Sequence, residues 1–280
     1  FSSLADDAKP VRGGSIVVSK VSKWSSLNPI RSNSRAADRQ LLSQIYESLL
    51  DLDSSDNIVP GLAVAWEFID NKTLVMTLKE GVAFHDGTPF DAQAAKYVLD
   101  WYISEGLNPV FASEIAELES VEVLDAYKIQ LNLSAPSSII MSALANLAGY
   151  MISPAAIEKY GEDLATNACG TGPFIVKEAI EGDHITLVRN ENYHALGEDG
   201  LPLPYLDQVT MKIITDDSVT AANLISGDVV LTDYLSTDAA DMIVASRSNT
   251  HLLVSNAIVQ WAVFFKVTHG HLQNADLRRA

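Results

Sequence analysis

Cysteine and long apolar runs are both scarce in this sequence. Cys169 is the single cysteine among 280 residues, so no disulfide can form within the chain, and a disulfide-stapled mini-protein is excluded. No run of about 18 apolar residues occurs, which excludes a transmembrane helix within these residues. What remains is a globular composition, 48% hydrophobic, in a chain long enough for one large domain or two ordinary ones.

Positive charge is also scarce. The chain has 19 Lys and Arg residues against 36 Asp and Glu residues, for a net charge of −17. Binding to nucleic-acid phosphates or to anionic lipid needs clustered basic residues, so we expect neither a nucleic-acid partner nor direct insertion into a membrane. The acidity favours solubility, and a preference for cationic solutes stays open because net charge does not reveal a site.

Motifs of catalysis and metal binding are missing as well. The sequence has no Gly-x-Ser-x-Gly, no His-Glu-x-x-His and no dinucleotide-binding fingerprint. Its six histidines are scattered, and even the closest pair, His269 and His271, falls short of the three or four ligands of a metal site. We therefore predict no metal, no cofactor and no catalytic residue. Carboxylates are abundant, so a hydrolase that uses a pair of them remains the alternative.

The spacing of apolar residues predicts a mixed α/β chain. Residues 14–20 and 73–79 have the apolar content or the alternation of buried strands. Residues 41–50 place their leucines and isoleucine on one stripe of a helix, and residues 136–148 are also predicted to be helical. Asp217 is predicted to cap a further helix that ends at Gly227.

A series of small motifs provides the most specific signal. In chain order they are Tyr46-Glu47-x-Leu49-Leu50, Pro60-Gly61-Leu62-Ala63-x-x-Trp66-Glu67, Asp70-x-Lys72-Thr73, Lys79-x-Gly81-Val82-x-Phe84-His85-Asp86-Gly87-Thr88-Pro89, Gly170-Thr171-Gly172-Pro173-Phe174 and Arg189-Asn190-x-Asn192-Tyr193. The series closely resembles the peptide/nickel/opine class of bacterial extracytoplasmic solute-binding proteins, the capture subunits of ABC importers. The chain departs from that pattern at Val230, usually acidic, and at Lys266, usually Asn.

The resemblance implies a fold class and a domain organisation. The fold is an α/β, periplasmic-binding-protein-like lobe of type II and of the peptide-binding class, with a mixed β-sheet and an inserted α+β subdomain. The implied parts are a flexible tail (1–13), a main lobe or lobe one (14–45 and 170–265), the inserted subdomain (46–169) and the start of the crossing to a second lobe (266–280). The chain covers about the first half of the family pattern, so the second lobe is expected to be largely absent.

The resemblance also implies a function. A short peptide or similar small solute would bind between two lobes and be delivered to the membrane permease subunits of an ABC importer. The protein would be a periplasmic monomer, secreted through a signal peptide that is not present in this chain, because residues 1–10 lack the pattern of one. Two alternatives remain: a carboxylate-based hydrolase on a similar α/β frame, and a receptor fragment that binds another protein.

Candidate ligand-binding residues lie in the loop 21–35, because α/β folds place ligand contacts on loops that leave core strands. They are Trp24, Ser25, Asn28 and Arg31, with Trp261 near the expected crossing. An aromatic ring offers contact area, and Arg31 could pair a ligand carboxylate in a bidentate manner. Trp24 could equally lie in the core, and these alternatives stay balanced until the resemblance favours the cleft.

Two further positions have competing interpretations. Cys169 fits a small buried thiol, with a catalytic thiol as the alternative. His85 and Asp86 fit a structural turn, with metal binding as the alternative.

Overall fold

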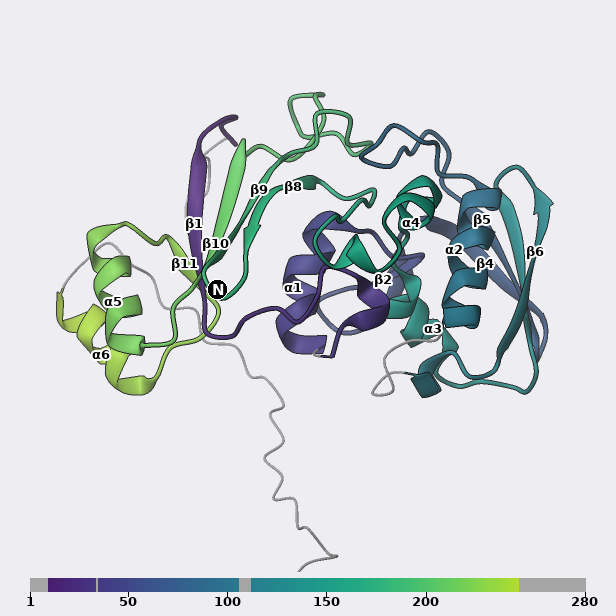
Figure 1. The fold of residues 1–280 in the computed structure, drawn as a ribbon, viewed down its shortest axis with the longest axis horizontal. Coiled ribbons are helices and arrows are strands. Elements are labelled where there is room, and N and C mark those ends of the chain that lie inside the picture. The colour runs from purple at the N-terminus through teal and green to yellow at the C-terminus, as the bar shows by residue number, and fades with distance from the viewer. Residues whose placement is uncertain (1–9, 34, 106–111, 247–280) are drawn as a thin grey trace, which may run out of the picture. The chain divides into compact units, whose positions relative to one another are not determined.

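The computed structural model describes residues 10–33, 35–105 and 112–246, and these residues all belong to one compact unit (Figure 1). The unit contains a five-stranded sheet, a four-stranded sheet and a two-stranded ribbon that pairs β2 (Leu50–Leu52) with β3 (Ile58–Pro60). The two larger sheets are formed by different stretches of sequence. The predicted division into a main lobe and an inserted subdomain stays a prediction.

The five-stranded sheet has the strand order β11-β1-β10-β9-β8. Its strands are β1 (Ser15–Lys20), β8 (Phe174–Ile180), β9 (His184–Arg189), β10 (Gln208–Ile213) and β11 (Leu231–Thr232). Strand β1 is parallel to β10 and β11, whereas β9 is antiparallel to both β10 and β8. The carboxyl ends of three neighbouring strands therefore meet at one end of the sheet, and β8 forms its far edge.

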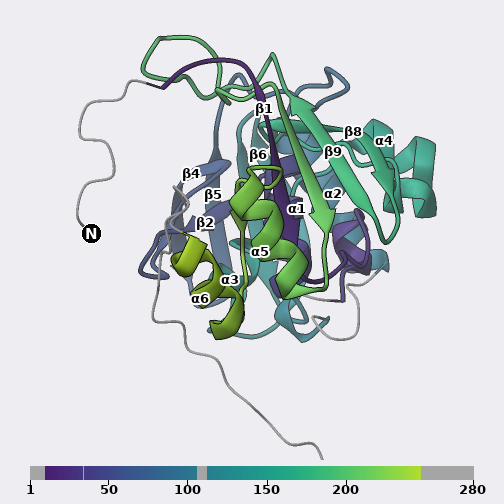
Figure 2. The same ribbon diagram turned by 90° about the vertical axis from the view of Figure 1, so that its left-hand side faces the viewer.

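Strand β1 separates two hydrophobic cores. Its side chains alternate between the sheet's faces, so Val18 joins the main core while Val17 packs against a smaller cluster beneath α5 (Asp217–Ser226) and α6 (Thr237–Ser246). The buried members of the smaller cluster are Ala221, Leu224, Val229, Ala239 and Ile243. Figure 2 shows the two helices together on this side of the sheet. Burial of each large aliphatic side chain contributes about 1.5–3 kcal/mol.

The four-stranded sheet is antiparallel throughout, with the order β4-β5-β7-β6. Its strands are β4 (Ala63–Asp70), β5 (Thr73–Leu78), β6 (Leu118–Asp125) and β7 (Lys128–Leu133). Helix α2 (Ala92–Glu105) packs on β6 and β7, and the Asp91 carboxylate caps it by accepting a hydrogen bond from Ala94 N at 2.9 Å. The strand predicted at 73–79 is confirmed to within one residue.

The remaining helices lie between these elements along the chain. They are α1 (Arg35–Ile45), α3 (Ile140–Leu144), α4 (Pro154–Tyr160) and the 3-10 helices η1 (Pro29–Arg31), η2 (Ala112–Glu114), η3 (Leu147–Gly149) and η4 (Gly161–Ala165). Within the described part of the chain, no helix combines the length and the apolar character that crossing a bilayer requires.

The helix predicted through residue 50 is wrong in its last turn, because α1 ends at Ile45. Leu49 and Leu50 are fully buried, as their spacing indicates, but their backbone bonds elsewhere: Leu49 N donates to Gly149 O at 2.9 Å, and Ala63 N donates to Leu49 O at 2.7 Å. Apolar spacing reports which side chains are buried, and here Leu49 lies in a bend and Leu50 begins β2.

Two other predicted helix limits also differ. The helix expected over 136–148 is reduced to α3 and η3. Helix α5 is capped by Asp216, whose Oδ1 accepts hydrogen bonds from Ser218 N and Val219 N, at 2.8 and 3.0 Å. Asp217 instead accepts a hydrogen bond from Ser236 N at 3.2 Å, so it joins the two helices of the smaller core. Gly227 ends α5 with φ +86°, as predicted.

Candidate functional site

The candidate site lies where β1, β10 and β11 end. Parallel strands bring their carboxyl ends to one edge, and in open α/β sheets ligands bind outside that edge. The loop 21–33 leaves β1 at this edge and leads into α1. The edge therefore combines three strand ends with a long polar loop, which is the usual composition of a small-molecule site.

A buried lysine marks this edge. The side chain of Lys20, the last residue of β1, is 7% exposed, and its ammonium donates to Asp233 Oδ2 at 2.6 Å and to Gln40 Oε1. Asp233 directly follows β11, and Gln40 lies on α1. The ion pair therefore joins the ends of two strands to the helix that follows the loop, and it places both signs of charge at the site.

A second buried charge holds the loop in place. Asp38, on α1, has no solvent exposure and accepts hydrogen bonds from Ser25 N at 2.7 Å, from Ser25 Oγ, and from Ser32 Oγ at 2.6 Å. Ser25 Oγ in turn accepts a hydrogen bond from Asn33 N at 3.0 Å. Buried carboxylates persist only when they are hydrogen-bonded, and here the bonds fold the loop back onto α1.

The predicted ligand contacts Trp24, Ser25 and Asn28 take structural positions. Trp24 is partly buried against the main core, and Ser25 belongs to the Asp38 network. Asn28 is 1% exposed, and its Oδ1 accepts a hydrogen bond from Ile30 N at 3.2 Å, which caps η1. These contacts explain how the loop is shaped. Ligand contact by the three residues stays a prediction, and Trp261 lies outside the described residues.

The side chain of Arg31 is 37% exposed, but it already has carboxylate contacts. Its guanidinium donates to Glu162 Oε1 at 2.6 Å and to Oε2 at 3.3 Å, and it lies 3.8 Å from Glu105 Oε2. The hydrogen bond to Glu162 raises the pKa of the guanidinium. A ligand carboxylate would therefore compete with Glu162 for Arg31.

The residues that sequence reasoning missed are Lys20, Asp38, Gln40 and Asp233. Lys20 and Asp233 are separated by 213 positions, and no local pattern joins them. The one available signal is a lysine that closes an otherwise apolar strand, since a lysine is rarely so buried without a partner.

Residues of the sequence motifs bond to the loop 21–33 and to one another. Tyr46 Oη donates to Leu27 O at 3.0 Å, so a fully buried tyrosine holds the middle of the loop, and burial raises its pKa. Glu47 Oε1 accepts a hydrogen bond from Tyr193 Oη at 3.0 Å and lies 2.9 Å from His194 Nε2. These contacts connect the start of the Tyr-Glu motif with the later Arg-Asn motif.

Hydrogen bonds hold the turn at His85 and Asp86 in place. His85 Nε2 lies 3.0 Å from Gly172 O, and His85 N donates to Gly170 O at 2.8 Å. Asp86 accepts hydrogen bonds from Thr88 N and Thr88 Oγ1, at 3.0 and 2.6 Å. These bonds favour the structural interpretation of the turn. Among the described residues, no three His, Cys, Asp or Glu side chains are arranged to hold a metal ion.

Cys169 is buried, and burial raises the pKa of its thiol to about 12. Because the thiolate is the reactive form, we expect a thiol reagent at pH 8 to label the folded protein at least about 100-fold more slowly than the unfolded chain. The measurement is the absorbance of a disulfide-exchange reagent with and without denaturant. Rapid labelling of the folded protein would instead favour the catalytic thiol.

Comparison with known proteins gives one family and several related chains. Residues 57–280 match the family model described as bacterial extracellular solute-binding proteins, family 5 Middle. The chain is 29% identical over 266 residues to the glutathione-binding protein GsiB of Salmonella paratyphi A, and 28% identical over 267 residues to that of Escherichia coli O157:H7. Each alignment covers 95% of this chain and 51% of the relative. The chain thus spans about half the length of the curated relatives it matches.

Solved structures have the same fold. AgaA from A. tumefaciens R10, in complex with agropinic acid, gives a TM-score of 0.73 at 25% identity over 81% of this chain and 45% of that one. AppA from Bacillus subtilis, in complex with a nonapeptide, gives a TM-score of 0.70 at 25% identity, and the match covers 86% of this chain and 47% of AppA. DppA from Helicobacter pylori gives a TM-score of 0.74 at 21% identity, and the match covers 84% of this chain and 49% of DppA. This is a likeness of fold alone. The predicted fold class is confirmed.

Proposed function

Because this chain belongs to the family 5 bacterial extracellular solute-binding proteins, we propose that it forms one lobe of a protein that captures a short peptide or similar small solute. The solute would be delivered to the membrane permease of an ABC importer from an extracytoplasmic location. The observation that carries the proposal is the shared carboxyl edge of β1, β10 and β11, with a long loop held rigidly beside it.

The charges at this edge suit a zwitterionic solute. Lys20 and Asp233 place an ammonium and a carboxylate at the strand ends, and Arg31 and Glu162 place a second pair on the loop side. A peptide carries an amine and at least one carboxylate, so each of its ends would find an opposite charge. Relatives named as glutathione-binding proteins support glutathione, a tripeptide, as the first solute to test.

The proposed mechanism is closure of two lobes over the solute, which buries it and creates a surface for the permease. Each lobe would contribute one wall of the cleft, so this chain supplies about half of the contacts. A carboxylate-based hydrolase and a receptor for another protein remain as outcomes of the same experiment. The relatives reported above are named as binding proteins rather than enzymes.

We expect the 280-residue chain to bind glutathione and tripeptides weakly, with a dissociation constant above about 100 µM, because one wall buries too little of the ligand to offset the entropy of association. Amide signals of residues 20–33 and 233–234 are expected to shift in an NMR titration. Asp233→Asn should weaken the binding further, whereas Asp125→Asn, at the exposed end of β6, should leave it unchanged.

Shifts confined to other parts of the chain would remove the carboxyl edge as the site. Micromolar or tighter binding by this chain would contradict the expectation that one wall of the cleft binds the solute only weakly. Steady release of hydrolysis products in the same tube would favour the hydrolase.

A further inference from the structure

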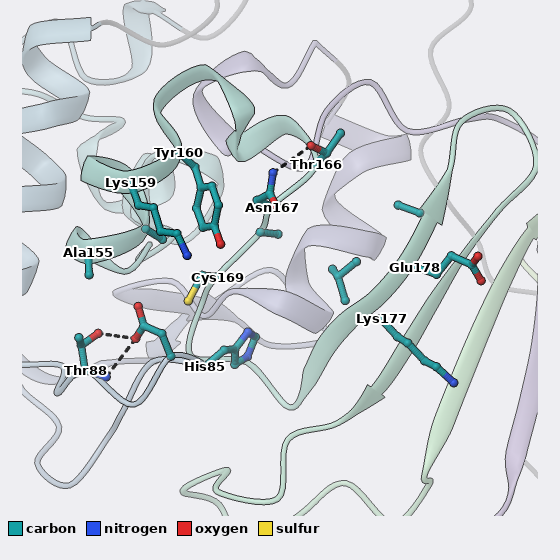
Figure 3. Close-up of a pocket in the computed structure, with 15 residues that line it drawn as sticks. His85, Thr88, Ala155, Lys159, Tyr160, Thr166, Asn167, Cys169, Lys177 and Glu178 are labelled. Carbon is teal, nitrogen blue, oxygen red and sulfur yellow. Dashed lines mark hydrogen bonds between the residues drawn. The ribbon is translucent and has the colours of Figure 1, made fainter.

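A hollow lies away from the candidate site. It has a volume of about 630 Å³ and is open to solvent. One wall is α4 with residues 166–169, the opposite wall is β8 from Val176 to Ala179, and the turn from His85 to Thr88 closes the base. Figure 3 shows Lys159 and Tyr160 on one side, β8 on the other, and Cys169 and His85 between them, with Thr88 below Ala155.

The hollow and the candidate site are at different places on the five-stranded sheet. Strand β8 is the edge opposite to β11, and β10 and β9 separate it from β1. Neighbouring strands lie about 4.8 Å apart, so three spacings place β8 about 14 Å from β1. A ligand held at the ends of β1 and β11 would not fill this hollow.

The base of the hollow is rigid. A Cβ atom at Gly170 would lie 2.2 Å from Ile45 O, so the backbone of this segment passes against α1 with no spare room. His85 bonds this segment at Gly170 O and lies 3.0 Å from Gly172 O. Ser153 N also donates to Cys169 O at 3.0 Å. The hollow is thus preformed, and a partner that enters it meets little cost of reorganisation.

The wall formed by β8 presents a free strand edge. Among the described residues, β8 pairs with β9 alone, so alternate residues direct backbone N–H and C=O groups away from β9. Four consecutive residues of β8, Val176 to Ala179, line the hollow, which places the backbone edge as well as side chains along it. An extended peptide could pair with this edge, because strand addition satisfies backbone groups on both chains.

The charges beside this edge select the kind of peptide. Neither Lys159 nor Lys177 has a carboxylate partner within the described ranges, although carboxylates outnumber basic residues almost two to one in the chain. The carboxylates of the hollow are engaged: Asp86 accepts hydrogen bonds from Thr88 and Ser153, and Glu178 lies 3.5 Å from His184 Nε2. The hollow therefore has two lysines without a carboxylate partner, and the ammonium of Lys159 lies 4.7 Å from the centre of the Tyr160 ring.

Lys177 also limits which strands can pair with β8. The register of β8 against β9 shifts between Val176 and Glu178, and Lys177 lies at this irregularity. An irregular edge that carries a lysine discourages pairing with apolar or basic strands. An acidic strand, in contrast, would be attracted by the positive charge of Lys177.

We propose that this hollow is a docking site for an extended, acidic polypeptide segment of a partner protein, which adds to the free edge of β8 and places carboxylates against Lys159 and Lys177. Side chains on one face of the added strand would contact α4. The docking site is independent of solute capture at the carboxyl edge.

The test uses the whole chain and a blocked peptide of about seven residues that alternates glutamate and valine, a length typical of one strand. In an NMR titration we expect amide signals of residues 176–179 to shift, and the double variant Lys159→Glu with Lys177→Glu to bind about tenfold more weakly, since each exposed charge pair contributes modestly. Lys128→Glu, an equal charge change on β7 of the other sheet, should leave the affinity unchanged.

Two further peptides separate strand addition from charge attraction. The same peptide with alternate backbone amides methylated should lose binding, because it cannot donate hydrogen bonds to the edge. Its lysine counterpart should not bind. Equal binding of the methylated peptide, an equal loss in Lys128→Glu, or no binding at millimolar concentrations of the acidic peptide would each overturn the proposal.

Discussion

Gly149→Ala is expected to lower the free energy of unfolding by at least about 3 kcal/mol, enough to abolish folding in a marginally stable chain. A Cβ atom at this position would lie 1.8 Å from Leu144 O and 2.5 Å from Leu144 C. Both are backbone atoms, so no side-chain rotation can relieve the overlap. Gly149 O also accepts the hydrogen bond from Leu49 N, and η3 packs against η1 of the loop at the candidate site.

The control for Gly149 is Gly182→Ala in the turn between β8 and β9. Gly182 has φ +76° and open space around it, so alanine there adds only the strain of a left-handed residue, about 1 kcal/mol. Urea unfolding of both variants, followed by circular dichroism, measures the difference. If the two variants were equally stable, the close approach of η3 to Leu144 could not be correct.

Asp38→Ala is expected to lower the free energy of unfolding by about 2–4 kcal/mol and to weaken any binding at the carboxyl edge. The substitution leaves the N–H of Ser25 and the hydroxyls of Ser25 and Ser32 without their acceptor. Ser32 is fully buried, and an unsatisfied buried donor costs about 1–3 kcal/mol. Asp38→Asn keeps one acceptor oxygen, so it should recover part of the loss.

Hydrogen exchange separates the local effect of Asp38 from a global one. In Asp38→Ala the amides of Ser25 and Asn33 should exchange faster than those of β9, because the network holds the loop and not the sheet. Asp100→Ala removes a partly exposed partner of Lys96 on α2 and should change stability by no more than about 0.5 kcal/mol. Unchanged protection at Ser25 would show that the loop is held by other contacts.

The local sequence pattern was sufficient to predict an element where the burial of its side chains follows the period of that element alone. Strand β5 lies where alternation placed it, because one buried face is enough to set a strand's side-chain period. Helix α2 and its Asp91 cap were also predictable, since both the apolar stripe and the capping residue are local in sequence. The order of the motifs carried the family, which the comparisons then confirmed.

The sequence by itself thus determined the α/β class, the family and strands such as β5, whereas only the tertiary structure decided the site. The tertiary structure ended α1 at Ile45, placed Leu49 in a bend outside the helix, and brought Lys20 to Asp233 across 213 positions. It also used Ser25 and Asn28 to shape the loop and gave Arg31 a carboxylate partner. The physical reason is that local periodicity reports burial along one element, while a buried charge finds its partner through the packing of distant elements.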